Sequence, residues 1–189
     1  MAASLLTLIP VAALFSVLPM MMAQDGLPSA AYGRTQIASA ATVVGLSPLF
    51  NSRLARRAQR PAPMVGLLGL SGVVLGAAMG SAGLASSAGG YTAAAALAVP
   101  GEIIAFVAAT NILDKIAPAS NRGLYAGIWG TTLAAAVLCS PALGGWALTY
   151  GGHHAVALIT LLSGLLAASL CLPLSALLYR PSCASETSA

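Results

Sequence analysis

Charged residues are scarce in this chain. Only 6% of its 189 residues are charged and 58% are hydrophobic, whereas about one quarter of a soluble domain is charged. So few charges cannot cover a globule with polar groups. The composition therefore excludes an ordinary soluble domain and predicts that lipid surrounds most of the protein.

Cysteine is also scarce, and the three thiols give no disulfide framework. Cys139 and Cys171 lie inside apolar runs, Cys183 lies in the C-terminal tail, and no CxxC spacing occurs. We expect them to be packing residues. His153 and His154 are adjacent, but two neighbouring ligands without a third do not form a coordination sphere. The sequence predicts neither a metal nor a cofactor.

Acidic residues are outnumbered by basic ones, four to eight, which gives a net charge of +4. This charge does not indicate nucleic-acid binding, because half of the basic residues share one short segment, residues 51–63. They are Arg53, Arg56, Arg57 and Arg60. Such clustering is typical of a cytoplasmic loop in a membrane protein. The arginines could set topology alone, or they could also hold helix C-termini together across that face.

Long runs without an acidic residue predict an all-α fold of six transmembrane helices within residues 1–180. We expect helices at 4–22, 32–50, 64–84, 91–113, 124–148 and 155–179, and a disordered cytoplasmic tail at 181–189. The first run could instead be a signal peptide, but no Lys or Arg precedes it. With the N-terminus inside, seven basic residues fall in cytoplasmic segments and Arg34 alone falls outside. Both termini are therefore predicted to be cytoplasmic.

Small residues recur at helical spacing in two of these runs. Gly72, Gly76 and Gly80 are four residues apart, so we expect this face to pack closely on another helix of the chain. Replacing Gly76 with Leu should then lower the folded yield, while Leu75→Ala should matter much less. The run at 124–148 holds four more candidate packing or bending positions, Gly127, Pro141, Gly144 and Gly145.

Glu102 is the one acidic residue inside a predicted span, and it is the middle residue of 91–113. It should lie roughly 16 Å from either end, at the centre of a bilayer about 30 Å thick. A carboxylate there faces a bundle interior or a wet pathway, and function is the default interpretation. Glu102 could carry a coupled proton, because a low dielectric disfavours the charged form, or it could neutralise a cationic substrate. It could also be a structural carboxyl bonded to a neighbouring helix. Thr110 and Asn111 lie too far along the helix to be its direct partners.

A GLSG motif at 69–72 together with the histidine pair imitates an intramembrane serine protease. The serine and the histidines are expected at different depths in the membrane. Ser71 should lie roughly 11 Å into the bilayer from the cytoplasmic side, whereas the histidines should lie at the opposite face. A nucleophile and its base must come within about 3 Å. We therefore expect no enzyme activity.

Several motifs follow one another in a recognisable order: the arginine segment, the glycine-faced helix, and Gly101-Glu102 within a helix. Ala117-Pro118 and RGLYAG at 122–127, which includes Arg122 and Gly123, come next, and SPALGG at 140–145 comes last. Over about residues 6–178, this order resembles the C-terminal six-helix half of a major facilitator superfamily transporter. It is most similar to bacterial multidrug efflux proton antiporters. The arginine segment departs from the family loop, since Arg56 stands where an acidic residue is expected.

The resemblance implies a fold of two inverted three-helix repeats. It implies proton-coupled efflux of small molecules across the bacterial inner membrane, with Glu102 as the coupling or substrate residue. Substrate in this family binds between two six-helix halves, so it also implies a missing N-terminal half or a second copy as partner. The alternative is a non-transporting membrane remnant or scaffold that keeps the fold.

Overall fold

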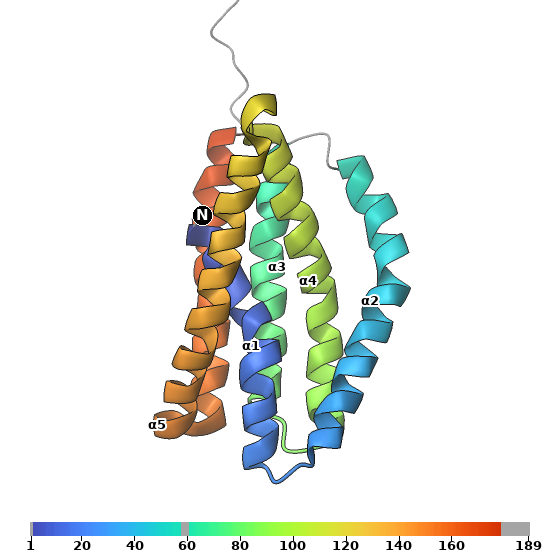
Figure 1. The fold of residues 1–189 in the computed structure, drawn as a ribbon, viewed down its shortest axis with the longest axis vertical. Helices are drawn as coiled ribbons and strands as arrows, with labels where there is room; N and C mark the ends of the chain where they lie inside the picture. The colour runs from blue at the N-terminus through green and yellow to red at the C-terminus, as the bar shows by residue number, and fades with distance from the viewer. Residues whose placement is uncertain (1, 58–60, 179–189) are drawn as a thin grey trace, which may run out of the picture.

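The structure, a computed structural model, describes residues 2–57 and 61–178, and their side chains except those of residues 51–63, 119 and 176–178. The described chain is all-helical (Figure 1). Its elements are α1 (Ala2–Gln24), α2 (Ser29–Arg57), α3 (Pro61–Ala82), α4 (Ala88–Ile116), the short 3₁₀ helix η1 (Ala119–Asn121) and α5 (Arg122–Leu178). The predicted tail at 181–189 and Arg60 lie outside the described residues.

The prediction of six helices is wrong in number, because the described residues form five α-helices. The last two predicted helices are one element, α5, with non-helical backbone only at Gly152, where φ is 61° and ψ is −159°. This conformation is almost restricted to glycine, so one residue reverses the chain where a longer turn was expected. The two arms, residues 122–151 and 153–178, run back alongside each other (Figure 1).

The arginine segment is also more helical than expected. α2 continues to Arg57, and α3 begins at Pro61, where a missing N–H costs nothing. Leu, Ala and Arg are strong helix formers, which accounts for the longer α2. The side chains of Arg53, Arg56 and Arg57 are not among the described ones. That these arginines hold other helix ends therefore stays a prediction.

Four helices are long and apolar enough to cross a membrane. They are α1, α3 from Met64 onward, α4 and α5, and α2 does not meet the same measure. Large apolar side chains on α5, such as Leu138 and Trp146, are 74% and 60% exposed. An exposed surface of this kind is compatible with a membrane protein, whose outer surface meets lipid instead of water.

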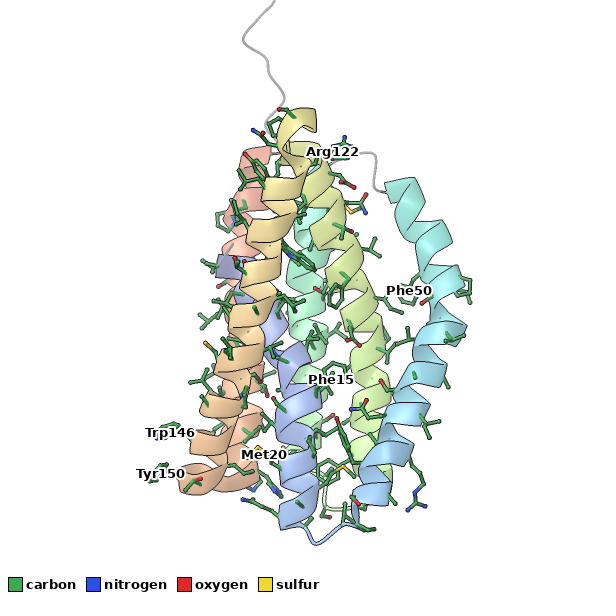
Figure 2. All side chains as sticks on the ribbon, viewed as in Figure 1. Phe15, Met20, Phe50, Arg122, Trp146 and Tyr150 are labelled. Carbon is green, nitrogen blue, oxygen red and sulfur yellow. The ribbon has the colours of Figure 1, made fainter. Side chains whose placement is uncertain are left out.

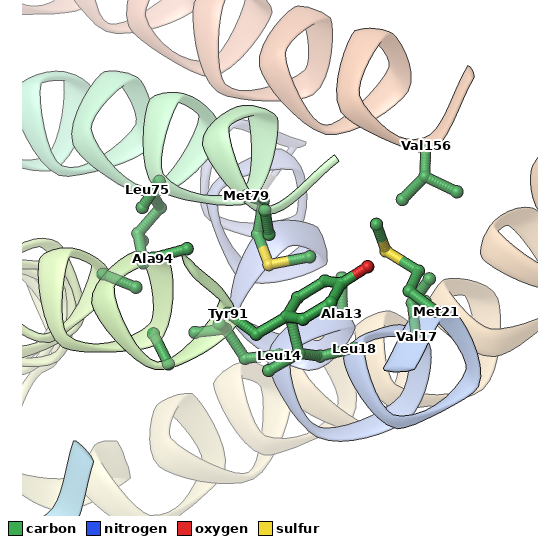
Figure 3. Close-up of a cluster of buried hydrophobic side chains, with 14 of the residues drawn as sticks. Ala13, Leu14, Val17, Leu18, Met21, Leu75, Met79, Tyr91, Ala94 and Val156 are labelled. Carbon is green, nitrogen blue, oxygen red and sulfur yellow. The ribbon is translucent and has the colours of Figure 1, made fainter. Parts of the chain in front are cut away.

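α1 is the central helix of the bundle. It carries no charge and is apolar all round, the pattern of a buried helix. Leu14, Leu18 and Met21 are buried in one cluster with Met79 of α3 and Tyr91 of α4 (Figure 3). Residues of α1, α3 and α4 therefore share one buried core.

Glycines bring α3 close to the second arm of α5. A Cβ added at Gly76 would lie 2.9 Å from the Thr160 carbonyl oxygen, and one at Gly72 would lie 3.1 Å from that of Gly164. Gly80 is looser, with its nearest neighbouring atom 3.9 Å away. Small residues on both helices thus allow the two backbones to approach.

The opposite side of α3 is buried too. Leu75 is fully buried and packs against Gly101 of α4, where an added Cβ would lie 2.9 Å from Leu75 Cγ. Leu75 was expected to be the tolerant neighbour of Gly76. That expectation is wrong, because α3 lies between α4 and α5 and has little free surface at this level.

The first arm of α5 contacts α1 through small residues. An added Cβ at Gly144 would overlap Val17, and one at Gly145 would lie 3.7 Å from Met20 Cε. Pro141 lies inside the helix of this arm. Around Gly127, in contrast, nothing lies within 4 Å of an added Cβ. In this arm, close glycine packing against α1 is therefore found near Gly144 and not near Gly127.

Candidate functional site

A groove of about 570 Å³ lies between α2 and α4. In Figure 1, α2 leans away from α4 toward the end where α4 finishes. The groove lining comes from α1, α2 and α4: Phe15, Gln36, Ser39, Ala40, Val43, Val44, Ser47, Glu102, Ile103, Phe106 and Val107. Phe15 is labelled in Figure 2 beside α1, on the side toward α4. Most of the described wall is apolar, and Glu102 is the one ionisable side chain among the described lining residues.

Polar contacts hold α2 against α4 and α1 near its start. The hydroxyls of Thr35 on α2 and Thr92 on α4 lie 2.9 Å apart. Tyr32 Oη donates to the Phe15 carbonyl oxygen at 3.4 Å and accepts a hydrogen bond from Gln36 Nε2 at 2.5 Å. These contacts fix one end of the groove and orient Gln36 in its wall.

The backbone of α4 explains why Glu102 faces the groove. Gly101 faces Leu75 of α3, where the helices are too close for a larger residue. Successive residues of an α-helix point about 100° apart, so the next residue is turned away from α3. Glu102 is half-buried there and lines the groove.

Glu102 has no hydrogen-bond or ion-pair partner within the described residues. The interpretation as a structural carboxyl requires a bond to a neighbouring helix, and the described side chains supply none. Thr110 and Asn111 instead bond back to their own helix, Thr110 Oγ1 to the Phe106 oxygen at 2.8 Å and Asn111 Nδ2 to the Val107 oxygen at 2.7 Å. The arrangement can therefore hold a proton or balance one positive charge inside an apolar groove.

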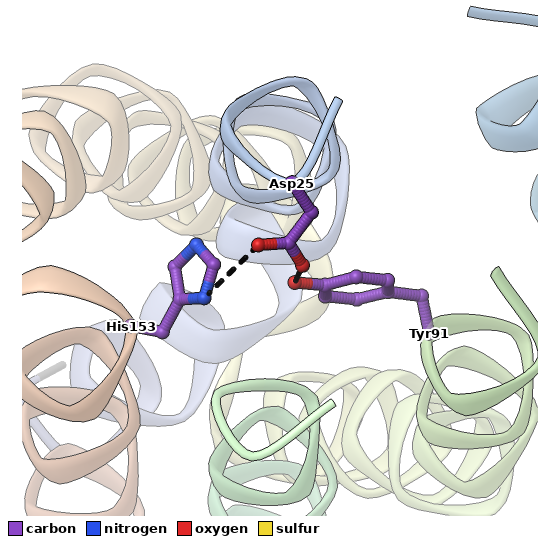
Figure 4. Close-up of polar contacts among 3 residues, drawn as sticks. All are labelled: Asp25, Tyr91 and His153. Atoms are coloured by element: carbon purple, nitrogen blue, oxygen red, sulfur yellow. Dashed lines mark hydrogen bonds and ion pairs between the residues drawn. The ribbon is translucent and has the colours of Figure 1, made fainter. Parts of the chain in front are cut away.

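A second polar cluster lies at the end of the bundle where α1 finishes (Figure 4). Tyr91 Oη donates a hydrogen bond to Asp25 Oδ2 at 2.6 Å, and His153 Nδ1 lies 3.7 Å from Asp25 Oδ1. The three residues come from the end of α1, the start of α4 and the reversal in α5. They tie together three helices that are distant in sequence.

Sequence reasoning missed this cluster. It treated His153 only as half of a weak metal candidate at the outer face. Asp25 follows the first predicted helix, 4–22, whose end lies at the same face, so an acid and a histidine on one side were the available signal. No group of three or more His, Cys, Asp or Glu side chains in the described chain could hold a metal ion.

The remaining candidates have local roles within the described chain. Ser71 is buried and donates to the Leu68 oxygen of its own helix at 2.7 Å, while His153 is engaged by Asp25. Cys171 is buried between α3 and α5, Cys139 is exposed, and Cys183 lies outside the described residues.

The turn before α5 carries the last of the predicted motif residues. Arg122 begins α5 after η1 and is exposed, and Figure 2 shows it at the end of the bundle opposite the one where α1 finishes. Nothing lies within 4 Å of a Cβ added at the next residue, Gly123. Neither residue is brought near Glu102.

Comparison of the chain with models of protein families, with curated proteins and with solved structures finds no match in any of the three. The similarity to the major facilitator superfamily therefore remains a prediction from the order and spacing of motifs.

Proposed function

We propose that the chain is one half of a membrane transporter of the major facilitator type. It moves small molecules by proton-coupled efflux, with Glu102 as the group that carries the proton. The observation that supports this function most directly is the position of Glu102. It is a carboxyl without a partner among the described side chains, in the wall of a groove of about 570 Å³ between two helices of an apolar bundle.

Because the groove wall is mostly apolar, the charge state of Glu102 affects both stability and binding. Burying an unpaired carboxylate is costly, so the group gains stability by taking up a proton or a cationic partner. Val43, Ile103 and Val107 can contact the apolar part of a substrate, while Ser39 and Ser47 offer hydrogen bonds. Competition between a proton and a cationic substrate for one carboxyl would give exchange of the two.

The proposal includes a partner for the open side of the groove. Substrate sites in transporters of this plan lie between two repeats near the bilayer midplane, and access alternates as one repeat moves against the other. Either a further six-helix half or a second copy of this chain would close the groove between α2 and α4. The lipid bilayer would cover the remaining apolar surface.

Proteoliposomes containing the purified chain test this function. With an imposed pH gradient, ethidium movement and the fluorescence of trapped pyranine report substrate and proton flux together. Glu102→Gln keeps size and hydrogen bonding but removes the titration, so coupled flux should collapse at unchanged protein level. Asp114→Asn, at an exposed position outside the groove, is the matched control and should keep full flux.

The variants also separate the alternatives. If Glu102 is instead a counter-ion, Glu102→Gln should slow the transport of cationic substrates and leave the transport of neutral substrates unchanged. Unchanged proton-coupled flux in Glu102→Gln would sink the coupling role. A folded wild-type chain that carries no flux, alone or as a cross-linked pair, would exclude a second copy as the partner and leave either a transporter that needs the further six-helix half or the scaffold without transport.

A further inference from the structure

Two exposed aromatic side chains lie together near the reversal of α5. Trp146 is 60% exposed and Tyr150 is 77% exposed, and their ring centroids are 5.7 Å apart. The two residues are four positions apart on one helix, so they share a face. Figure 2 shows both side chains pointing away from the bundle. The described chain therefore leaves most of this aromatic pair open to its surroundings.

Each side chain of the aromatic pair combines a large apolar ring with a polar tip. Neither Trp146 Nε1 nor Tyr150 Oη has a hydrogen-bond partner within the described residues. In water the rings would stay exposed, and in the hydrocarbon core of a bilayer the two polar tips would lose their hydrogen bonds. A boundary between the two media satisfies both parts of these side chains at once.

The exposed surface of α5 changes from apolar to polar at the level of the aromatic pair. Toward the middle of the first arm, Leu138 is 74% exposed. Beyond the pair the chain reaches the reversal at Gly152, and His154 is exposed there. Along the helix axis, Tyr150 lies roughly 3 Å and Trp146 roughly 9 Å before Gly152. The aromatic pair thus marks the place where the apolar surface ends.

We propose that Trp146 and Tyr150 anchor the reversal of α5 in the headgroup boundary of the outer leaflet of the bilayer. Their rings lie against the upper part of the acyl chains, and their polar tips bond to oxygens of the lipid headgroup region. The partner is the lipid surface, because the exposed apolar side chains Leu138 and Leu143 lead up to the pair on the same arm. The anchor requires only that the chain spans a membrane, and it does not depend on transport.

The other end of the same arm lies at the right distance for the opposite boundary. A hydrocarbon core about 30 Å thick corresponds to about 20 helical residues. Counting back from Trp146 by this length reaches Ala126, one turn inside Arg122, which is exposed. No Asp, Glu, Lys or Arg occurs in residues 123–152. The charge-free part of the arm therefore matches the membrane when Trp146 lies at one boundary.

Depth-dependent fluorescence quenching tests the position of the aromatic pair. Trp146 and Trp129 are the two tryptophans of the chain, so Trp129→Phe leaves Trp146 as the one reporter. In liposomes, lipids brominated on the acyl chain near the headgroup should quench Trp146 more strongly than lipids brominated near the chain terminus. Acrylamide in the water should quench it much less than it quenches a free indole.

Three results of the quenching experiment would overturn the anchor. Strongest quenching from the chain terminus would place the pair deep in the hydrocarbon. Strong quenching by acrylamide without quenching by brominated lipid would place it in water. Weak quenching by every reagent would assign the pair to a contact with another protein, such as a second copy of this chain.

A second experiment keeps Trp129 and tests whether the aromatic pair holds the depth of the reversal. Thr149 is exposed beside the pair, so Thr149→Cys in a cysteine-free background can carry the fluorophore NBD. Its emission maximum should be the same in short-chain and long-chain phosphatidylcholine bilayers, because interfacial aromatic residues set how a helix adapts to bilayer thickness. With Trp146→Leu and Tyr150→Leu combined, the emission should shift to the blue in the thicker bilayer, as the end of the arm sinks into hydrocarbon.

Leu138→Ala combined with Leu172→Ala is the matched control for the loss of exposed apolar contact. The two leucines are 74% and 70% exposed, and neither has a polar tip. This variant should keep the constant NBD emission of the parent chain. Emission that responds to thickness equally in the parent and in the variant with both aromatic residues replaced would refute the anchor, as would constant emission in both.

Discussion

Replacing Tyr91 with Phe should destabilise the protein by about 1–2 kcal/mol. The change removes the hydroxyl that donates to Asp25 at 2.6 Å and leaves the fully buried ring in place, so no cavity is created. Hydrogen bonds to charged groups contribute about 1.5–3 kcal/mol. The Asp25 side chain is 21% exposed, so water can take over part of the interaction, and the expected loss falls toward the lower end.

A double-mutant cycle isolates this bond from the other contacts of the two residues. Tyr91→Phe, Asp25→Ala and the double variant should give a coupling free energy of about 1–2 kcal/mol. Thermal unfolding in detergent measures it, and each kcal/mol should shift Tm by about 2–4 °C for a chain of this length. His153 also approaches Asp25, so Asp25→Ala alone should cost more than Tyr91→Phe alone.

Tyr150→Phe is the matched control for the loss of a phenolic hydroxyl. Tyr150 is 77% exposed and its ring lies against Trp146 with centroids 5.7 Å apart. Its replacement should change stability by less than about 0.5 kcal/mol. If the two single changes at Tyr91 and Asp25 were fully additive, the bond would contribute nothing, and the reasoning about this cluster would be refuted.

Two further predictions concern packing and topology. Gly76→Leu should sharply lower folded yield, because its Cβ would lie 2.9 Å from a backbone oxygen of α5, whereas Gly127→Leu has open space; equal yields would contradict the close approach. Leu75→Ala should itself cost about 2–5 kcal/mol in unfolding free energy, since Leu75 is fully buried. In a cysteine-free background, a cysteine at Ser52 should be labelled from the cytoplasmic side and one at Ser87 from outside. Labelling at Ser52 from outside would reverse the orientation and remove the basis of the family resemblance.

The apolar helices were predictable because composition alone decides them. Long runs without charge and the breakers between them predicted helices close to α1, α3 and α4, and Gly26 at the first break has the positive φ of 71° that a glycine allows. The reversal in α5 was harder, because a run of Gly and His can form either a loop or a one-residue turn. Only the conformation of Gly152 decides between them.

The polar cluster of Asp25, Tyr91 and His153 could not be derived in the same way. The hydrogen bond joins residues 66 positions apart in sequence, and periodicity along one helix says nothing about which other helix end lies beside it. Hydropathy also ignores buried partners, since Tyr91 counts as one more apolar residue of its span. Contacts that depend on how helix ends meet need the three-dimensional arrangement.

The polar residues of α2 lower its hydropathy as a membrane span, and they also mark the candidate site. α2 is the helix that fails the measure of an apolar span, and part of its polarity comes from Gln36, Ser39 and Ser47. These three side chains line the groove that Glu102 also lines. A helix that presents polar groups to a groove must lose hydropathy on that face, while its opposite face can still meet lipid. The polarity that made 32–50 a poor span is therefore physically linked to the groove. Replacing these residues with alanine would make α2 more apolar and remove the hydrogen-bonding groups that face Glu102.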